Sequence, residues 1–390
     1  MKPRFEVGQV LRQHWDWAKS NGRFNAHQLR NLRALSLCRT AEMGGHVDAC
    51  NHCGCIRISY NSCRNRHCPK CQAKEREEWI LRRQADLLPV PYFHMVFTLP
   101  SALNPYCLRH PAELYKLLFQ SAWQTLKAFA KDAKHLGAQP GMVAILHTWG
   151  QQLMLHPHIH CIVPGGGLTA KGKWKHSRAE GKYLFPKKAV SKVFRAKFAH
   201  GFRQWAASQG IALPEALFKQ LFAKPWVVYA KRPFLGPNQV LEYLGRYTHK
   251  IAISNYRLLS VTPQQVAFSY KDYRQKATQK TMALDAHEFI RRFALHILPP
   301  GFVRIRHYGI LASRNKSICL QQARAHLKVA TPPVAQASWK QICAQRLGFE
   351  PDQCPYCHTG RMVYVIGFGR GGPPWEYLRK RGFNLTHLAN

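Results

Sequence analysis

Acidic residues are scarce in this sequence. Its 390 residues include 19 Asp and Glu against 58 Lys and Arg, which gives a formal net charge of +39 at pH 7. A compact chain with this excess repels itself strongly unless it works against a polyanion. Nucleic acid is the natural partner, because a protein that neutralises phosphates releases their counterions. The charge balance therefore predicts a nucleic-acid-binding protein.

Long apolar runs are also missing. No stretch approaches the ~18 apolar residues of a membrane-spanning helix, and no basic amphipathic anchor is present. The N-terminal residues, MKPRFEVGQVLRQ, lack the apolar core of a signal peptide. These absences count against a membrane partner and favour a cytoplasmic protein.

The rest of the composition is typical of a folded protein, with 46% hydrophobic and 12% aromatic residues. A chain of this length usually divides into two or three domains. Apolar residues at helical spacing predict two short helices within 6–40 and a longer one over 111–131. Strand-forming residues predict one strand at 92–99 and two strands around a turn within 141–168. This irregular alternation predicts an α+β fold in which helices cover a sheet.

The thirteen cysteines are unevenly spread along the chain. In a large intracellular basic protein, a cysteine cluster binds metal more often than it forms disulfides. Such a cluster lies between Cys50 and Cys71. The scattered cysteines, which we expect to be small core residues, are Cys38, Cys107, Cys161, Cys319 and Cys343.

Two Cys-x-x-Cys pairs within this cluster have the spacing of a four-thiolate structural zinc site. Each pair presents two sulfur atoms to one tetrahedral ion, and a shell closed in this way leaves no open position for catalysis. The predicted ligands are Cys50, Cys53, Cys68 and Cys71. Other residues within reach that could replace a member are Cys63, His67 and His46.

A further pair, Cys354 and Cys357, stands near the C-terminus, and no second pair follows it. It could be half of a metal site completed by His358 or by a distant cysteine, or it could bind nothing. The sequence decides neither way.

Basic side chains gather beside the cysteine cluster and again between residues 171 and 250, where aromatic residues are interleaved with them. The second region favours a charged groove with stacking rings for single-stranded nucleic acid. The simpler alternative is a set of amphipathic helices and rims with solvated basic faces. The cations that we expect to contact DNA are Arg64, Arg66, Lys70, Arg246 and Lys250.

The strand candidate LHPHIHCIV, at 155–163, carries histidines at every second position. Alternate side chains of a strand share a face, so His158 and His160 project the same way, about 7 Å apart, while Ile159 faces the core. Two imidazoles on a rigid strand can hold one divalent ion and leave room for water, a phosphate oxygen and a third protein ligand. The alternative is a pair of core histidines bonded to backbone carbonyls. His156 is in phase with both but stands behind a proline.

A metal that polarises a phosphodiester needs a nucleophile. Tyr243 and Tyr247 stand four residues apart in VLEYLGRYTHK, a predicted helix, so both phenols share one face. A tyrosine nucleophile forms a covalent 5′-phosphotyrosine, which stores the energy of the broken bond for rejoining. The same spacing is common in core packing, so the tyrosines gain weight only beside the histidine pair.

Five segments together resemble bacterial insertion-sequence transposases of the rolling-circle, two-tyrosine type: CRNRHCPKC, YFHMVFTLP, HPHIHCIVPGG, YLGRYTHKIAISNYR and EFIRRFALHILPPGFVRIRHYGILA. The resemblance covers roughly residues 25–315. It implies a helical and zinc-binding domain over 1–88 and a HUH endonuclease domain over 89–315, with an antiparallel sheet covered by helices. Residues 316–390 would form a C-terminal tail.

The resemblance also implies roles for site residues. His158 and His160 would bind Mg²⁺ or Mn²⁺, and Tyr243 and Tyr247 would be the nucleophiles, although family members differ in needing one tyrosine or two. The candidates for the third metal ligand are His156 first, then Gln151 and Gln152. The chain lacks a GxxxxGK[ST] phosphate loop, so a helicase would be a host partner.

The expected function is nicking and transfer of single-stranded DNA at the ends of an insertion sequence, in the bacterial cytoplasm and associated with the nucleoid. A non-catalytic, zinc-dependent nucleic-acid-binding protein is the first alternative, but it leaves the histidine pair unused. A phosphoesterase that uses water is the second. Such a site usually needs several carboxylates, and the nearest acids in sequence are Asp132 and Glu180.

Overall fold

The computed structural model describes residues 3–179, 183–230, 239–240, 243, 245, 249–273, 275–333 and 337–385. The chain folds into two compact units, each assembled from segments that are distant in sequence. The terminal unit consists of Met1–Glu78, Ile253–Ala294 and Gln336–Asn390, and the central unit of Trp79–Ala252 and Leu295–Ala335. This division differs from the three consecutive domains expected from the sequence, because the C-terminal segment returns to pair with the N-terminal one.

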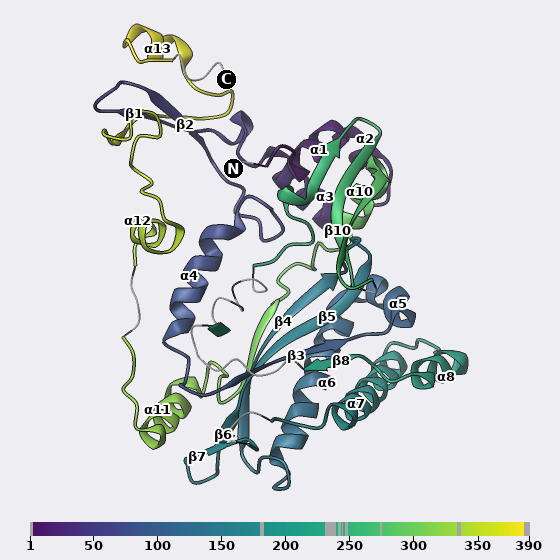
Figure 1. Cartoon of the computed structure of the whole chain (residues 1–390). Helices are drawn as coiled ribbons and strands as arrows, with labels where there is room; N and C mark the ends of the chain where they lie inside the picture. Colours follow the sequence, from purple (N-terminus) through teal and green to yellow (C-terminus); the bar gives the residue numbers. More distant parts are fainter. Residues whose placement is uncertain are drawn as a thin grey trace. The chain divides into compact units, whose positions relative to one another are not determined.

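The central unit is built on a seven-stranded sheet in which every described pair of neighbours is antiparallel. Its order is β7-β6-β4-β5-β3-β8, and β12 also pairs with β4. The strands are β3 (Tyr92–Thr98), β4 (Gln139–Trp149), β5 (Leu155–Pro164), β6 (Gly166–Leu168), β7 (Trp174–His176), β8 (Val228–Ala230) and β12 (Ile305–Gly309). The predicted antiparallel sheet covered by helices is thus confirmed (Figure 1).

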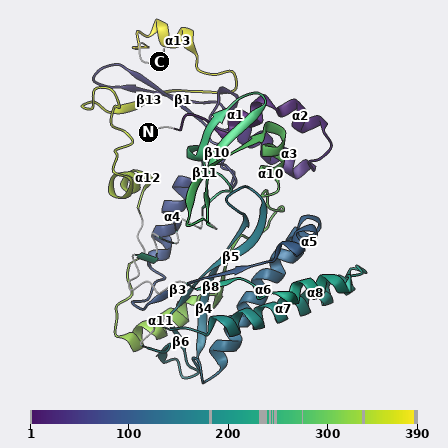
Figure 2. The same ribbon diagram turned by 45° about the vertical axis from the view of Figure 1, so that its right-hand side comes forward.

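Helices cover one face of this sheet. They are α5 (Asn104–Arg109), α6 (Pro111–Lys131), α7 (Lys187–Ser208) and α8 (Glu215–Ala223), with a 3₁₀ turn at Ser101–Leu103. Figures 1 and 2 both show α6 and α7 side by side along the sheet. The core between them takes one residue in two from each strand, such as Phe97 and Ile159, and packs them against Leu118 and Phe194. This alternation places the intervening strand residues on the opposite face.

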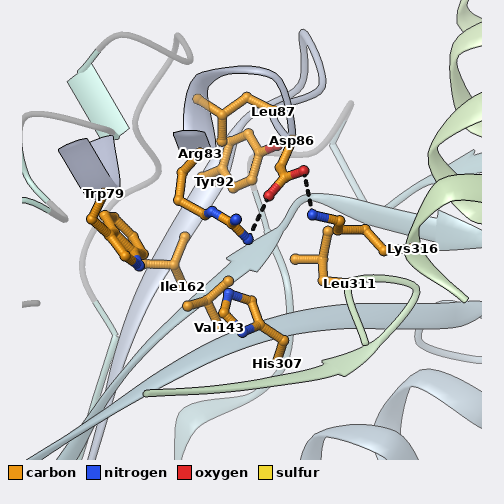
Figure 3. Close-up of a pocket in the computed structure, with 10 residues that line it drawn as sticks. All are labelled: Trp79, Arg83, Asp86, Leu87, Tyr92, Val143, Ile162, His307, Leu311 and Lys316. Carbon is orange, nitrogen blue, oxygen red and sulfur yellow. Dashed lines mark ion pairs between the residues drawn. The ribbon is translucent and has the colours of Figure 1, made fainter. Parts of the chain in front are cut away.

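The opposite face carries a second apolar cluster, in which Val143, Ile145 and Ile162 pack against α11 (Lys316–Leu327). A small apolar pocket opens here beside His307 (Figure 3). Asp86 forms ion pairs with Arg83 and Lys316 at 2.8 and 2.7 Å, which ties α11 to the segment that follows α4 (Gln72–Gln84).

The terminal unit begins with three helices where two were predicted: α1 (Val7–Gln13), α2 (Trp15–Ser20) and α3 (Ala26–Leu37). A capping box starts α3, because the Asn25 side chain accepts from the Gln28 backbone N–H and the Gln28 side chain accepts from the Asn25 N–H. A meander of β9 (Leu258–Val261), β10 (Gln265–Asp272) and β11 (Thr278–Asp285) packs against α10 (Ala286–Ala294). Shorter elements are the 3₁₀ turns Ala41–Met43 and Asn255–Arg257, α12 (Trp339–Ile342), a π turn at Cys343–Leu347 and α13 (Trp375–Lys380).

A second sheet of the terminal unit joins the two ends of the chain. The hairpin of β1 (Gly45–Cys50) and β2 (Ile56–Tyr60) pairs antiparallel with β13 (Met362–Phe368), so that β1 is the central strand. The register sets Cys50 opposite Met362 and Gly45 opposite Phe368. Gly45 has to be glycine, since a Cβ there would lie 2.3 Å from the Ser59 carbonyl oxygen.

Within the described part of the chain, no helix combines the length and the apolar character needed to cross a membrane.

Candidate metal and nucleophile site

Three histidines of the central unit converge on the sheet face opposite α6 and α7. They are His147 on β4 and His158 and His160 on β5, and one ring nitrogen from each lies within 4.8 Å of the others. His147 stands directly across from His158 in the β4–β5 register, and the period of two along β5 adds His160. The arrangement can hold one metal ion with three imidazoles.

The third histidine of this set was not among the residues expected from the sequence. His156, the first candidate, is exposed, and Gln151 and Gln152 lie in the turn between the strands. Directly opposed residues on antiparallel strands lie closer together than residues two apart along one strand. Strand pairing therefore favours His147 over His156 as the neighbour of His158, and this pairing cannot be read from local spacing.

His158 has the hydrogen-bond pattern of a metal ligand. Its Nδ1 lies 2.7 Å from the backbone carbonyl oxygen of His156. A carbonyl oxygen only accepts, so His158 Nδ1 donates, and in the neutral ring Nε2 is left with a lone pair. A second hydrogen bond that orients the ring in this way is the usual companion of metal ligation.

Burial keeps these rings neutral. It lowers the pKa of His158 to about 3 and holds the pKa of His160 well below its ordinary value, with nearby positive charges, Lys250 among them, adding to the effect. Metal binding requires an unprotonated nitrogen, and near neutral pH neither of these two rings has to lose a proton before it binds a metal. Lys250, expected to contact DNA, is exposed and sits close enough for its charge to act on both histidines.

A fourth histidine links the set to a tyrosine. His94 on β3 lies with its Nε2 2.8 Å from His160 Nδ1 and its Nδ1 2.8 Å from the Tyr243 hydroxyl. His94 is almost fully buried, at 3% exposure. The sequence did contain a signal for it: a histidine in the apolar strand YFHMVFTL, in phase with the histidine face once β3 pairs with β5.

Tyr243 is thus brought to the histidines, as the sequence suggested. Tyr247 and Arg246 lie outside the described residues.

The cysteines of the terminal unit form two four-thiol sets instead of the single set predicted from their spacing. One set contains Cys38, Cys63, Cys68 and Cys71, and the other contains Cys50, Cys53, Cys354 and Cys357. The two N-terminal pairs thus separate, because β13 brings the C-terminal pair to the β1–β2 turn. Cys38, which we expected to be a core residue, is a member of the first set, and His67 and His46 belong to neither.

The first set has the dimensions of a zinc site. The sulfur of Cys38 lies 3.5 Å from those of Cys68 and Cys71, and Cys63 lies 3.7 Å from Cys71. Four sulfurs at about 2.3 Å from one tetrahedral zinc ion are separated from each other by about 3.8 Å. The backbone N–H of Cys63 also points to the Cys38 sulfur, at 3.5 Å.

Of the basic residues beside this set, Arg64 is exposed, Arg66 is half-buried, and burial lowers the pKa of the Arg66 guanidinium. Lys70 is engaged within the unit, because its Nζ lies 2.7 Å from a carboxylate oxygen of Glu6. Arg64 is therefore the residue of the three best placed to meet a phosphate.

Two family models match the chain. Residues 141–317 match a family described as "Putative transposase", and residues 10–99 match one described as "Transposase zinc-binding domain". The first range contains the three histidines and Tyr243, and the second contains the first four-cysteine set. The family match therefore supports structural zinc in this set.

Two curated proteins are similar over almost their whole length. "Putative transposase y4qJ" of Sinorhizobium fredii is 42% identical over 391 residues, which cover 95% of this chain and 98% of that protein. "Transposase for insertion sequence element IS801" of Pseudomonas savastanoi pv. phaseolicola is 28% identical over 403 residues, which cover 97% of this chain and 91% of that protein. No solved structure matches the chain. The chain therefore belongs to the insertion-sequence transposases that combine a zinc-binding domain near the N-terminus with a transposase domain.

Proposed function

We propose that this transposase nicks single-stranded DNA at the ends of its insertion sequence and holds the 5′ end as a phosphotyrosine on Tyr243. The ion would be Mg²⁺ or Mn²⁺, held by His147, His158 and His160. The observation that carries the proposal is the continuous hydrogen-bonded path from the Tyr243 hydroxyl through His94 to His160. A tyrosine that served only as core packing would need no such link to a set of metal ligands.

The residues present fit a divalent ion. His158 Nδ1 lies against a carbonyl oxygen and His160 Nδ1 lies against His94, so Nε2 is the nitrogen that each of these rings would turn to a metal. Three imidazoles are softer ligands than the oxygen shell that Mg²⁺ prefers, and the set contains no carboxylate. Mn²⁺, which accepts imidazole more readily, is the better match of the two. When bound, the ion would act as a Lewis acid on a non-bridging oxygen of the scissile phosphate.

A metal held at His160 Nε2 would fix the direction of the hydrogen bonds. A neutral His160 that gives its Nε2 lone pair to a metal carries its proton on Nδ1 and donates it to His94 Nε2. His94 then carries its own proton on Nδ1 and donates it to the Tyr243 oxygen. A donor aimed at the phenolic oxygen favours the phenolate, which is the form that attacks phosphorus.

The Tyr243 oxygen forms a bond to phosphorus as the bond from phosphorus to the 3′ oxygen breaks, and the phenolic proton leaves to solvent. The departing 3′ oxygen takes up a proton from solvent and leaves as a hydroxyl. The same steps in reverse join a 3′-hydroxyl to the stored 5′ end, which is strand transfer. Unwinding of the duplex would be the task of a host helicase.

The unpaired strand would pass the exposed ring of Tyr229 on the edge strand β8. This residue pairs with Val96 in the register of β3 and lies with its ring centroid 6.4 Å from that of His94, on the face of the site. Tyr229 is 46% exposed, and the Lys187 ammonium lies over its ring at 5.9 Å. An exposed aromatic ring beside a cation suits a nucleobase and its phosphate.

The test uses an oligonucleotide that carries the element's end, labelled at either its 5′ or its 3′ terminus. A 5′-phosphotyrosine retains the 3′-labelled fragment on the protein through denaturation and releases the 5′-labelled fragment with a free hydroxyl. We expect this adduct with Mn²⁺ and its loss in Tyr243→Phe. An adduct that persists in Tyr243→Phe and disappears in Tyr247→Phe would move the nucleophile to Tyr247.

Two other outcomes would favour the alternatives. DNA that is bound tightly but unchanged after long incubation with Mn²⁺ would indicate a non-catalytic, zinc-dependent binding protein. Nicked DNA with free 5′-phosphate ends and no adduct would indicate attack by water.

A further inference from the structure

The second four-cysteine set joins residues from opposite ends of the chain. Cys50 and Cys53 belong to the turn that follows β1, whereas Cys354 and Cys357 precede β13 in the C-terminal segment. The sulfur of Cys50 lies 3.7 Å from that of Cys357, and Cys53 lies 3.7 Å from Cys354. All four ligand atoms are within 4.8 Å of one another. These separations suit the edges of a tetrahedron around one zinc ion, which are about 3.8 Å.

Both Cys-x-x-Cys turns aim backbone amides at their sulfurs. In the first turn, the N–H groups of His52 and Cys53 lie 3.4 and 3.5 Å from Cys50 Sγ. In the second, the N–H of Tyr356 lies 3.5 Å from Cys354 Sγ and that of Gly360 lies 3.4 Å from Cys357 Sγ. Amides placed in this way stabilise thiolates, the form in which cysteine binds metal. Two turns that each direct backbone amides at cysteine sulfurs therefore face each other.

The backbone between the two turns is closely fitted. A Cβ at Gly360 would lie 2.4 Å from Cys50 Sγ and 2.6 Å from His52 Cβ, so only glycine allows the approach. Asn51 locks the turns together, because its N–H lies 3.0 Å from the Arg361 carbonyl oxygen and its side-chain oxygen accepts from the Arg361 N–H at 2.8 Å. The contact that brings the four sulfurs together is thus specified by neighbouring residues and not by the cysteines alone.

A buried ion pair fixes the C-terminal segment to the N-terminal one at a second place. Glu77 on α4 is 2% exposed, and one of its carboxylate oxygens lies 2.7 Å from the Arg346 guanidinium. Arg76 contacts the other oxygen at 2.6 Å. Because the buried Glu77 carboxylate contacts both arginines, Arg346 holds the C-terminal segment at a defined position in the terminal unit.

From these contacts we infer that Cys50, Cys53, Cys354 and Cys357 bind a second structural zinc ion, which clasps the C-terminal segment to the N-terminal hairpin. The zinc-binding family match ends at residue 99 and so includes only half of these ligands. The four thiols are free and form a closed shell, which suits a structural ion and leaves no catalytic position. The inference is independent of the nuclease chemistry proposed for the central unit.

The test is the zinc content of the purified full-length protein, measured by mass spectrometry of the metal and by release with a thiol-reactive mercurial. We expect two zinc ions per chain in the wild type and one in the Cys354→Ser/Cys357→Ser double variant. Cys38→Ser/Cys71→Ser should also retain one, and the combined variant none. Cys343→Ser is the matched control, because this buried cysteine of the same segment belongs to neither set, and it should retain two.

A second variant keeps the test decisive if the double variant does not fold. Gly360→Ala leaves every thiol in place and blocks only the approach of the two turns, so it should bind one zinc ion. Cobalt exchanged into the wild type should show sulfur-to-metal charge transfer with twice the intensity found in either double variant. One zinc ion in the wild type, two in Cys354→Ser/Cys357→Ser, or iron in place of the second zinc would each overturn the inference.

Discussion

His94 and Tyr243 are joined by a hydrogen bond of 2.8 Å between the imidazole Nδ1 and the phenolic oxygen. The other nitrogen of His94 contacts His160, so one buried ring touches both the proposed nucleophile and a proposed metal ligand. This geometry couples two properties that are usually measured separately, namely metal affinity and the reactivity of the tyrosine.

His94→Ala should therefore impair both properties. Loss of a residue that orients a metal ligand typically weakens metal binding about 10- to 100-fold, and loss of the hydrogen bond to Tyr243 should slow adduct formation by about 100-fold or more. Calorimetry with Mn²⁺ and a single-turnover adduct assay would measure the two effects. Tyr243→Phe is the comparison, since it should abolish the adduct and leave Mn²⁺ affinity within a few-fold of wild type. Unchanged Mn²⁺ affinity in His94→Ala would break the proposed link.

His147 and His156 offer a matched pair for identifying the third ligand. His147→Ala removes a member of the three-histidine set and should lower Mn²⁺ affinity at least 10-fold, whereas His156→Ala removes an exposed ring outside the set. His158 bonds to the backbone carbonyl at 156, which the alanine retains. The reverse order of effects would restore His156 as the ligand.

Mn²⁺ should support adduct formation at lower concentration than Mg²⁺. Three imidazole nitrogens and no carboxylate form a softer set than Mg²⁺ prefers. Activity titrated against each ion in the same buffer would show the order. Equal half-saturation, or a preference for Mg²⁺, would mean that oxygen ligands missing from the three-histidine set dominate the site.

Tyr229→Ala should weaken binding of a single-stranded oligonucleotide, because an exposed ring that stacks on a base contributes about 1–3 kcal/mol. Fluorescence anisotropy would detect the corresponding loss of roughly 5- to 150-fold. Tyr183→Ala is the control, since Tyr183 is similarly exposed in the central unit, at 42% against 46% for Tyr229. Equal losses in both variants would argue against a specific path along β8.

Acid should destabilise the central unit through His307. Burial in the apolar pocket, together with the charges of Arg83 and Lys316, lowers the pKa of His307 to about 4. Its pKa in the unfolded chain is about 6.5, so the unfolded state binds the proton first and the free energy of unfolding falls as the pH drops from 6.5 to 4. The loss attributable to this group is up to about 3 kcal/mol.

His307→Phe should remove that part of the pH dependence. Denaturant titrations at pH 7 and pH 4.5 would give the free energy of unfolding of both proteins. Between these two pH values the wild type should lose more of this free energy than His307→Phe. Parallel curves for the wild type and His307→Phe would show that His307 does not titrate in this range.

The parts of the site that could be predicted from sequence are those carried by local spacing. His158 and His160 stand two apart on one strand, so a period of two was enough to put both on one face. Tyr243 was predicted from its neighbourhood in a helix and from a family resemblance. The spacings of the histidines and of the tyrosines lie within a few residues of the side chains concerned, whereas the resemblance draws on segments spread over roughly residues 25–315.

His147, His94 and the grouping of the cysteines depend on pairings between distant segments. β4 and β3 flank β5 in the sheet, and only that order brings His147 and His94 to the other two histidines. Two Cys-x-x-Cys pairs close in sequence suggested one zinc site, although the segment that leads into β13 provides the neighbours of Cys50 and Cys53. Sequence spacing identifies which cysteines occur in pairs, but strand order decides which pairs meet.

The zinc ion inferred between Cys50 and Cys357 would also set an order of events during synthesis. The β1–β2 hairpin leaves the ribosome early, and its Cys50 and Cys53 thiols meet Cys354 and Cys357 only after the segment that leads into β13 has been made. The central unit, whose last residues precede that segment, can complete its fold meanwhile. A stop codon placed after Ala335 and before Cys354 should therefore yield a protein that still binds Mn²⁺ but lacks one zinc ion.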